Sequence, residues 1–167
     1  GVSDATLNNC SLTGNSASDD GGGAYRGTLN DCLLSGNWAY SYGGGYYAGS
    51  PLNNALNNCT LTGNQANSGG GAYGGTLNNC ALTANSASQN GGGAYGANGR
   101  LNYCTLTGNT ARLGGAAYDA RLNNCTLKGN SASGYGGGAY GSAASLSTLN
   151  NCTLTGNSAS QWGGGAS

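Results

Sequence analysis

The stretch Leu56-Asn57-Asn58-Cys59-Thr60-Leu61-Thr62-Gly63-Asn64 decides how this chain folds, because its pattern returns seven times. The pattern is Leu-Asn-x-Cys-x-Leu-x-x-Asn, and each copy is followed by a glycine cluster and usually by a tyrosine. Successive cysteines are 22, 27, 21, 24, 21 and 27 residues apart. Self-similarity at such a period is typical of a solenoid, whose units cannot bury a hydrophobic face alone and therefore stack.

Within one repeat, the alternation of small side chains indicates a strand. In Cys59-Thr60-Leu61-Thr62 the cysteine and leucine lie on one face and the threonines on the other, which is the period of an extended strand. Leu56 is out of phase with that strand, so a bend at Asn57-Asn58 is needed to turn it inward. Gly63-Asn64 predicts the next corner, since Gly and Asn accept positive φ at low cost.

The segment Gly69-Gly70-Gly71-Ala72-Tyr73 is expected to be a third extended piece. Three short strands and three corners in about 24 residues make one coil of a parallel β-helix, an all-β fold. Residues 1–167 therefore form a single β-solenoid of about seven coils. The distance from the tyrosine to the next cysteine varies from 7 to 12 residues. Insertions are thus confined to one corner, in loops such as Gly49–Ala55 and Gly141–Thr148.

Composition excludes several classes of function. The 167 residues include five basic and five acidic side chains and no histidine. Nucleic-acid binding needs clustered Lys and Arg, which this chain lacks. No apolar run is long enough to span a membrane. The aspartates are scattered apart from Asp19-Asp20, so no group of carboxylates predicts catalysis. We expect no enzyme, no cofactor and no metal site.

The cysteines form the first predicted ladder of equivalent residues. Equivalent residues of stacked coils lie about 4.8 Å apart, which is within reach of a disulfide. The number of cysteines is odd, however, and all of them are expected to point inward. The cysteine ladder has three interpretations: buried reduced thiols, some disulfides between neighbouring coils, or metal binding. We favour the first. The ladder comprises Cys10, Cys32, Cys59, Cys80, Cys104, Cys125 and Cys152.

A second ladder consists of the asparagine that follows each cysteine by five residues. Stacked side-chain amides can form hydrogen bonds from coil to coil, as they do in cross-β assemblies, so we expect a structural role at a turn. The ladder comprises Asn15, Asn37, Asn64, Asn85, Asn109, Asn130 and Asn157.

Two outward-facing sets are the candidate contact surfaces. The threonines of the repeat predict a Thr-x-Thr array that resembles the ice-binding face of insect β-helical antifreeze proteins, although Leu33, Ala81 and Lys128 interrupt it. Threonine is also simply a good residue for the solvent face of a strand. The array comprises Thr13, Thr60, Thr62, Thr83, Thr105, Thr107, Thr153 and Thr155.

The tyrosines after the glycine clusters are the other set. They predict either an exposed aromatic stripe, suited to a lateral contact or a glycan, or a cover over the glycine-rich strand beneath. The set comprises Tyr25, Tyr47, Tyr73, Tyr95, Tyr118 and Tyr140.

The two ends of the sequence predict that the last coil of one copy can stack on the first coil of the next. Solenoids are normally capped, because a bare terminal coil exposes apolar side chains and strand edges, and neither end carries a cap pattern. Joining Ser167 to Gly1 of a second copy gives a spacing of 25 from Cys152 to Cys10, within the observed 21 to 27. Either copies stack head to tail, or the chain is part of a longer repeat array.

Each repeat contains a Gly-Gly-Ala motif and a Leu-x-x-Asn motif. This pair of motifs resembles the repeats of bacterial polymorphic outer-membrane proteins and related autotransporter-passenger-like surface proteins. The matching positions are Gly22-Gly23-Ala24-Tyr25 and Leu12-Thr13-Gly14-Asn15, with their equivalents along the chain. The resemblance implies right-handed winding and a structural or adhesive role at an extracellular surface. We therefore expect a filament, sheath or adhesin stalk whose partners are its own copies. An ice-binding solenoid is the main alternative, and a carbohydrate-binding or carbohydrate-active β-helix is the third.

Overall fold

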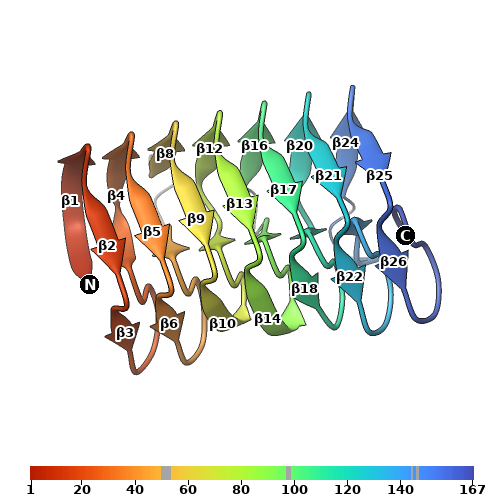
Figure 1. Ribbon diagram of the computed structural model, residues 1–167, viewed down its shortest axis with the longest axis horizontal. Coiled ribbons are helices and arrows are strands. Elements are labelled where there is room, and N and C mark those ends of the chain that lie inside the picture. The colour runs from red at the N-terminus through yellow and green to blue at the C-terminus, as the bar shows by residue number, and fades with distance from the viewer. Residues whose placement is uncertain (50–53, 97–98, 144, 146) are drawn as a thin grey trace.

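The chain is wound into a stack of similar coils. The computed structural model describes residues 1–49, 54–96, 99–143, 145 and 147–167. These residues contain no helix, and their strands pair in parallel in three sheets. In Figure 1 the chain descends along the front strands and ascends behind them while it advances from the N-terminus to the C-terminus, which is a right-handed coil. The predicted parallel β-helix is confirmed.

Sheet A has 12 strands and carries both the Ala-Tyr and the Leu-Asn segments of the repeat. In β1 and β4 the two segments are one continuous strand, and in later coils they are separate strands. The strands are β1 (Val2–Asn8), β4 (Ala24–Asn30), β7 (Tyr46–Tyr47), β8 (Ala55–Asn57), β11 (Ala72–Tyr73), β12 (Thr76–Asn78), β15 (Ala94–Tyr95), β16 (Arg100–Asn102), β19 (Ala117–Tyr118), β20 (Arg121–Asn123), β23 (Ala139–Tyr140) and β24 (Thr148–Asn150).

Sheets B and C have seven strands each. Sheet B consists of β2 (Ser11–Thr13), β5 (Leu33–Ser35), β9 (Thr60–Thr62), β13 (Ala81–Thr83), β17 (Thr105–Thr107), β21 (Thr126–Lys128) and β25 (Thr153–Thr155). Sheet C consists of β3 (Ser16–Ala17), β6 (Trp38–Ala39), β10 (Gln65–Ser68), β14 (Ser86–Asn90), β18 (Thr110–Ala111), β22 (Ser131–Ala132) and β26 (Ser158–Ala159).

Sheet C differs from the expected third strand. Of the expected extended piece Gly69–Tyr73, Ala72–Tyr73 is a strand, β11 of sheet A, but the glycines are not: Gly69 has φ of +65° and opens a turn, and the remaining strand of the coil is the preceding Gln65–Ser68. The strand at the Ser-Ala segment was not predicted, because two or three small residues are too few to show the alternation of a strand. The expected loops Gly49–Ala55 and Gly141–Thr148 include residues 50–53, 144 and 146, which lie outside the described residues.

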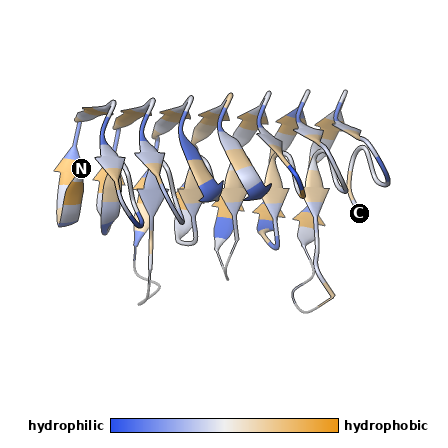
Figure 2. Ribbon diagram, turned by 90° about the horizontal axis from the view of Figure 1, so that it is seen from below, coloured by the Kyte–Doolittle hydropathy of each residue, from blue (hydrophilic) through white to orange (hydrophobic). Residues whose placement is uncertain are grey.

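Equivalent residues of successive coils are paired directly. For example, Leu82 pairs with Leu61 on one side and with Leu106 on the other. Each inner coil buries one leucine from sheet A, one from sheet B and one alanine from sheet C, as Leu77, Leu82 and Ala87 do. Figure 2 shows the result as hydrophobic segments that recur at the same place in each coil. Burial of a leucine side chain contributes about 1.5–3 kcal/mol, so the interior is held by thin apolar stripes.

Two corners depend on residues with positive φ. The first is the predicted Asn57-Asn58 bend, where Asn58 has φ of +54°. The second is the corner before the inner asparagine, where Gly63 has φ of +63° and a Cβ would meet nothing within 4 Å. Glycine is therefore needed at the second corner for its backbone conformation and not for lack of space. Ala84 is the exception there, with φ of +53°.

We expect Ala84→Gly to stabilise the fold. A left-handed conformation costs a non-glycine residue roughly 1–2 kcal/mol, and the extra entropy of unfolded glycine returns about 0.5–1 kcal/mol of that. The net gain is about 0.5–1 kcal/mol, measured as a higher urea midpoint at unchanged slope. The matched control is Gly108→Ala, at the same corner of the next coil, which should lose a similar amount. A lower midpoint for Ala84→Gly, or a higher one for Gly108→Ala, would contradict this explanation.

Candidate functional site: ladders of stacked side chains

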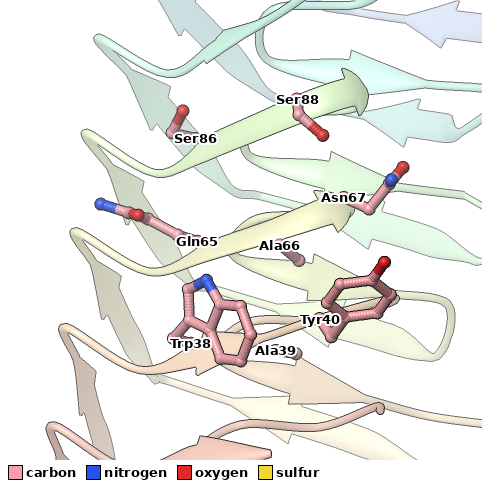
Figure 3. Close-up of a pocket in the computed structure, with 8 residues that line it drawn as sticks. All are labelled: Trp38, Ala39, Tyr40, Gln65, Ala66, Asn67, Ser86 and Ser88. Atoms are coloured by element: carbon pink, nitrogen blue, oxygen red, sulfur yellow. The ribbon is translucent and has the colours of Figure 1, made fainter. Parts of the chain in front are cut away.

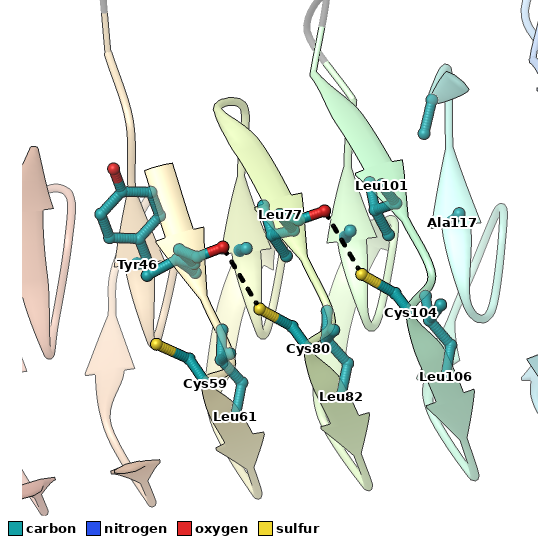
Figure 4. Close-up of a cluster of buried hydrophobic side chains, with 14 of the residues drawn as sticks. Tyr46, Cys59, Leu61, Leu77, Cys80, Leu82, Leu101, Cys104, Leu106 and Ala117 are labelled. Carbon is teal, nitrogen blue, oxygen red and sulfur yellow. Dashed lines mark hydrogen bonds between the residues drawn. The ribbon is translucent and has the colours of Figure 1, made fainter. Parts of the chain in front are cut away.

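The cysteine ladder runs along the interior. All seven cysteines are free, the five inner ones are buried, and Cys10 and Cys152 are half-buried. The thiol of Cys80 lies 3.5 Å from the carbonyl oxygen of Leu56 and 3.3 Å from that of Asn78. Figure 4 shows Cys59, Cys80 and Cys104 on successive coils, beside the leucines of sheets A and B. The side chains fill the corner between these two sheets as small hydrophobic groups.

The inner thiols form hydrogen bonds with one another, which shift their pKa values in opposite directions along the ladder: those of Cys80 and Cys125 are lowered. Hydrogen bonding with Cys80, followed by burial, raises the pKa of Cys59. Hydrogen bonds with Cys125 and Cys80, followed by burial, raise the pKa of Cys104. Although the thiolate is the reactive form, all five inner cysteines are buried, so burial keeps reagents away from them whatever the direction of the pKa shift.

A thiol reagent should therefore divide the cysteines into two classes. We expect Ellman's reagent to modify Cys10 and Cys152 in the native chain and the five buried cysteines only after unfolding. Mass spectrometry of digested, labelled protein identifies the sites. Equal labelling rates at Cys10 and Cys80 would show that the ladder is not buried.

The inner asparagine ladder is the most extensively hydrogen-bonded set of side chains. The Oδ1 of Asn85 accepts two hydrogen bonds from Asn64, from the backbone N–H at 3.0 Å and from Nδ2 at 2.9 Å. The Nδ2 of Asn85 donates to the carbonyl oxygen of Leu61 and to Oδ1 of Asn109. Asn37, Asn64, Asn85, Asn109 and Asn130 are fully buried. Each amide therefore ties three consecutive coils together.

A second asparagine ladder lies outside and was missed in the sequence analysis. The Nδ2 of Asn78 donates to Oδ1 of Asn57 at 2.9 Å, and Asn102 donates to Asn78 in the same way. The asparagine that follows each sheet A leucine was readable as a repeat, but its role depends on the stacking. This outer ladder comprises Asn8, Asn30, Asn57, Asn78, Asn102, Asn123 and Asn150.

The threonine face is the outward side of sheet B. Its two columns are in straight register, so that Thr62 lies between Ser35 and Thr83. One column reads Thr13, Ser35, Thr62, Thr83, Thr107, Lys128 and Thr155. The other reads Ser11, Leu33, Thr60, Ala81, Thr105, Thr126 and Thr153. All eight predicted threonines lie on this face.

The six predicted tyrosines form one continuous column. Neighbouring rings are stacked, with centroids 4.6 Å apart for Tyr73 and Tyr95 and 5.4 Å apart for Tyr118 and Tyr140. Their side chains are half-buried. A Cβ on Gly136 would lie 2.7 Å from the Cβ of Tyr140. The column thus covers the glycine turns and still presents ring edges to solvent, so it combines features of both readings of the sequence.

The tyrosine column should make stability fall at alkaline pH. Burial first, and then the neighbouring Tyr95, raises the pKa of Tyr73 to about 12 from an ordinary value of 10.0. Burial also raises the pKa of Tyr47, Tyr95 and Tyr118. Below pH 10 both states keep these protons, and between about pH 10 and 12 only the unfolded state releases them.

We therefore expect the tyrosines to lower the free energy of unfolding between about pH 10 and 12 and to leave it unchanged below about pH 10. The measurement is urea unfolding at several pH values, with tyrosinate absorbance recorded alongside. Tyr73→Phe keeps the ring and removes one titrating group, so it should make the decrease shallower. Titration of all tyrosines near pH 10 in the folded chain would contradict the prediction.

Tyr46 is a buried residue that the sequence analysis missed. It stands where other coils have an inward alanine such as Ala72, its partner in sheet A. Its side chain is fully buried, and its hydroxyl donates to the carbonyl oxygen of Gly27 at 2.8 Å. Burial raises the pKa of Tyr46 well above its ordinary value. A Cβ on Gly75 would lie 3.4 Å from Cε1 of Tyr46, so the absence of a side chain there leaves room for the ring.

The outward side of sheet C is a further face that the sequence analysis did not identify. It carries small hydroxyl residues in most coils, such as Ser86 and Ser131. In the second coil these are replaced by Trp38 and Tyr40, which are 43% and 68% exposed. The Asn-Ser-Ala-Ser pattern in the sequence was the available signal.

Charged groups are few and separate. Asp4 and Arg26 form an ion pair at 3.8 Å, and Asp119 accepts hydrogen bonds from Ser142. Within the described part of the chain, no group of three or more His, Cys, Asp or Glu side chains could hold a metal ion. The same residues include no helix long and apolar enough to cross a membrane.

Comparison of the chain with protein-family models, with curated proteins and with solved structures found no match.

Proposed function

We propose that this chain is a structural β-solenoid that is extended end to end by further coils of the same kind. The product is an extracellular filament, sheath or adhesin stalk. One observation carries the proposal: every coil uses the same surface to contact the next, through three parallel strand pairings and the two asparagine ladders. Such a contact is heterologous and does not close on itself, so it generates open filaments.

The proposed mechanism is mechanical. Strand hydrogen bonds along the axis link each coil to its neighbour in all three sheets. The buried asparagines add hydrogen bonds that cannot exchange with water. Pulling two coils apart would exchange these hydrogen bonds for bonds to water, at a net cost of about 0.5–1.5 kcal/mol each. The stack is therefore stiff along its length, while the threonine face and tyrosine column are available for lateral contacts.

The junction between two copies can be specified atom by atom. In the inner coils each asparagine donates its backbone N–H and Nδ2 to Oδ1 of the next one. At the junction Asn157 would donate in this way to Asn15 of the next copy. Val2 pairs with Ala24, and Ala166 pairs with Ala139, so Val2 and Ala166 occupy equivalent positions at the two ends of the same column. An incoming Val2 would therefore need the edge of Ala139 that Ala166 occupies.

The test is end-to-end association of the purified chain. We expect sedimentation velocity and electron microscopy to show linear assemblies. At about 4.8 Å per coil the axial repeat is roughly 33 Å or a multiple. A variant without Ala166 and Ser167 should associate more strongly, because it frees the edge of Ala139. In assemblies, Cys10 and Cys152 should also become protected from thiol reagents.

Asn15→Ala tests the junction itself. It removes the acceptor for Asn157 of the preceding copy, so assembly should be lost while the single chain stays folded. The matched control is Ser11→Ala, in the same coil but facing outward on the threonine face. A chain that stays monomeric at its highest soluble concentration, with and without Ala166 and Ser167, would reject the proposal. If the Asn15→Ala variant assembles as well as the unchanged chain, the proposed Asn157–Asn15 junction is rejected.

Display at a cell surface is part of the proposal. It is supported by the resemblance of the repeats to those of bacterial surface proteins with β-helical passengers. Antibody labelling of intact cells of the source organism tests it, with permeabilised cells as the control. Labelling only after permeabilisation would place the protein inside.

Ice binding is a second candidate, and the register of the threonine face favours it. Five hydroxyl residues, Thr13, Ser35, Thr62, Thr83 and Thr107, follow one another in one straight column. If this face binds ice, the chain should show thermal hysteresis. Lys128→Thr should increase the hysteresis and Thr62→Lys should abolish it. Unshaped ice crystals at high protein concentration would dismiss this candidate.

A further inference from the structure

The second coil is unlike the others on its sheet C side. The outward position of β6 is Trp38, where neighbouring coils of the same column have Ser16 and Gln65. Two residues further on is Tyr40. The two rings are in an edge-to-face arrangement, with centroids 6.4 Å apart. Both are among the most exposed large hydrophobic side chains of the described chain.

These rings border a groove of about 370 Å³ on the face of sheet C. Ala39 and Ala66 also line it and are themselves buried, so they lie beneath the outward side chains. The side of the groove away from the rings is formed by Gln65, Asn67, Ser86 and Ser88. In Figure 3 the two rings lie on one side, and the amide and hydroxyl groups lie on the next two strands. The volume is within the range of small-molecule sites.

The chemistry of the lining restricts the ligand. None of the eight lining residues carries a charge at neutral pH, so an ionic ligand would find no counter-charge. Gln and Asn amides and Ser hydroxyls both donate and accept hydrogen bonds. The tryptophan and tyrosine rings offer flat apolar faces with a polar edge. The matching ligand is neutral, has flat C–H faces, and carries hydroxyl groups at its rim.

A peptide strand is a poorer match. The strand β6 already pairs with β3 on one side and β10 on the other. No backbone edge is left there for a peptide to extend the sheet, which is how extended peptides gain most of their affinity. Recognition in this groove has to come from side chains alone.

We propose that the groove bordered by Trp38 and Tyr40 binds a neutral oligosaccharide. A sugar ring stacks on Trp38, and its hydroxyl groups form hydrogen bonds with Gln65, Asn67 and the serines of β14. The site is independent of end-to-end stacking, because it lies on the outer face of sheet C and not on a coil-to-coil contact.

The test uses the two tryptophans of the chain. In a Trp162→Phe background, Trp38 is the only tryptophan and reports on the groove. We expect saturable changes in its fluorescence with at least one of cellohexaose, chitohexaose, xylohexaose and mannohexaose. A polygalacturonic acid oligomer, which is anionic, should have no effect. Monomeric protein is used, so failure of filament formation would leave the result interpretable.

Trp38→Ser and Leu33→Thr introduce residues that other coils have at these positions, such as Ser16 and Thr60. Trp38→Ser should weaken binding at least about tenfold. The measurement is affinity electrophoresis in gels that contain a soluble polysaccharide made of the same sugar units as the hexasaccharide that binds. Tyr40→Phe keeps the ring and should retain most of the affinity. Leu33→Thr, on the same coil but on the threonine face, is the matched control and should bind normally.

Two results would overturn the proposal. One is the absence of any fluorescence change or retardation with all four neutral sugars. The other is unchanged sugar binding in Trp38→Ser. If Trp38→Ser instead abolishes lateral association of copies and no sugar binds, the face is a protein contact and the saccharide site is rejected.

Discussion

Asn85→Ala is expected to destabilise the chain by about 3–5 kcal/mol. The side chain is fully buried, and its Oδ1 accepts the backbone N–H and the Nδ2 of Asn64. Removing it leaves both donors of Asn64 without that acceptor, at about 1–3 kcal/mol each. The cavity adds to the loss, since the backbone strands around it cannot collapse inward. Urea unfolding measures the change.

The matched control is Asn78→Ala in the outer ladder of the neighbouring corner. Asn78 also links its coil to the coils on both sides, but it is only half-buried, so water can replace its partners. Its loss should stay below about 1.5 kcal/mol, as for an ordinary hydrogen bond. Equal losses for Asn78→Ala and Asn85→Ala would show that burial does not give the inner ladder its importance.

Gly92→Ala is expected to be the second large effect, through close approach of coils. A Cβ at Gly92 would overlap the carbonyl oxygen of Thr110 and lie 2.5 Å from that of Gly115. Both atoms belong to the backbone of the next coil, which cannot shift without breaking strand pairings. Overpacking in a rigid site costs about 1–3 kcal/mol and sometimes more, and we expect at least about 3 kcal/mol here. For a chain of this size that lowers Tm by about 6–12 °C.

Gly63→Ala is the control that separates close approach from backbone conformation. A Cβ at Gly63 meets nothing within 4 Å, and only its φ of +63° is unfavourable. The cost should be about 0.5–1 kcal/mol, the left-handed conformation being partly offset by the lower entropy of unfolded alanine, and Ala84 in the next coil shows that the corner accepts alanine. Circular dichroism during heating compares the two variants. A smaller Tm decrease for Gly92→Ala than for Gly63→Ala would contradict the packing argument.

Features that belong to a single coil were predictable from the sequence. The alternation in Cys59–Thr62 predicted which side chains point inward, and the bend at Asn57-Asn58 predicted the burial of Leu56. Both depend on local conformation: a period of two in the strand, and a residue with positive φ at the corner. The cysteine and asparagine ladders followed because equivalent residues must lie above one another in a stack.

Other features depend on contacts between coils and could not be predicted from the sequence. Sheet C is built from segments as short as Ser131–Ala132, and such segments show no period. Tyr46 is inward although the residue after it, Tyr47, belongs to the half-buried column. The groove at Trp38 requires side chains from three coils, 38–40, 65–67 and 86–88, whose equivalent positions are 27 and 21 residues apart. No local pattern indicates which of them meet.

By itself the sequence determined the strands that carry the Leu-Asn and Cys-x-Leu segments, the two corners with positive φ, and the inward positions of cysteine and leucine, since these follow from backbone conformation and from the alternation of side chains along a strand. Only the tertiary structure decided which hydrogen bonds those residues form and which outer surfaces they build. The physical reason is that the amide ladders, the tyrosine column and the groove exist between coils, at a separation set by strand pairing and not by position along the chain.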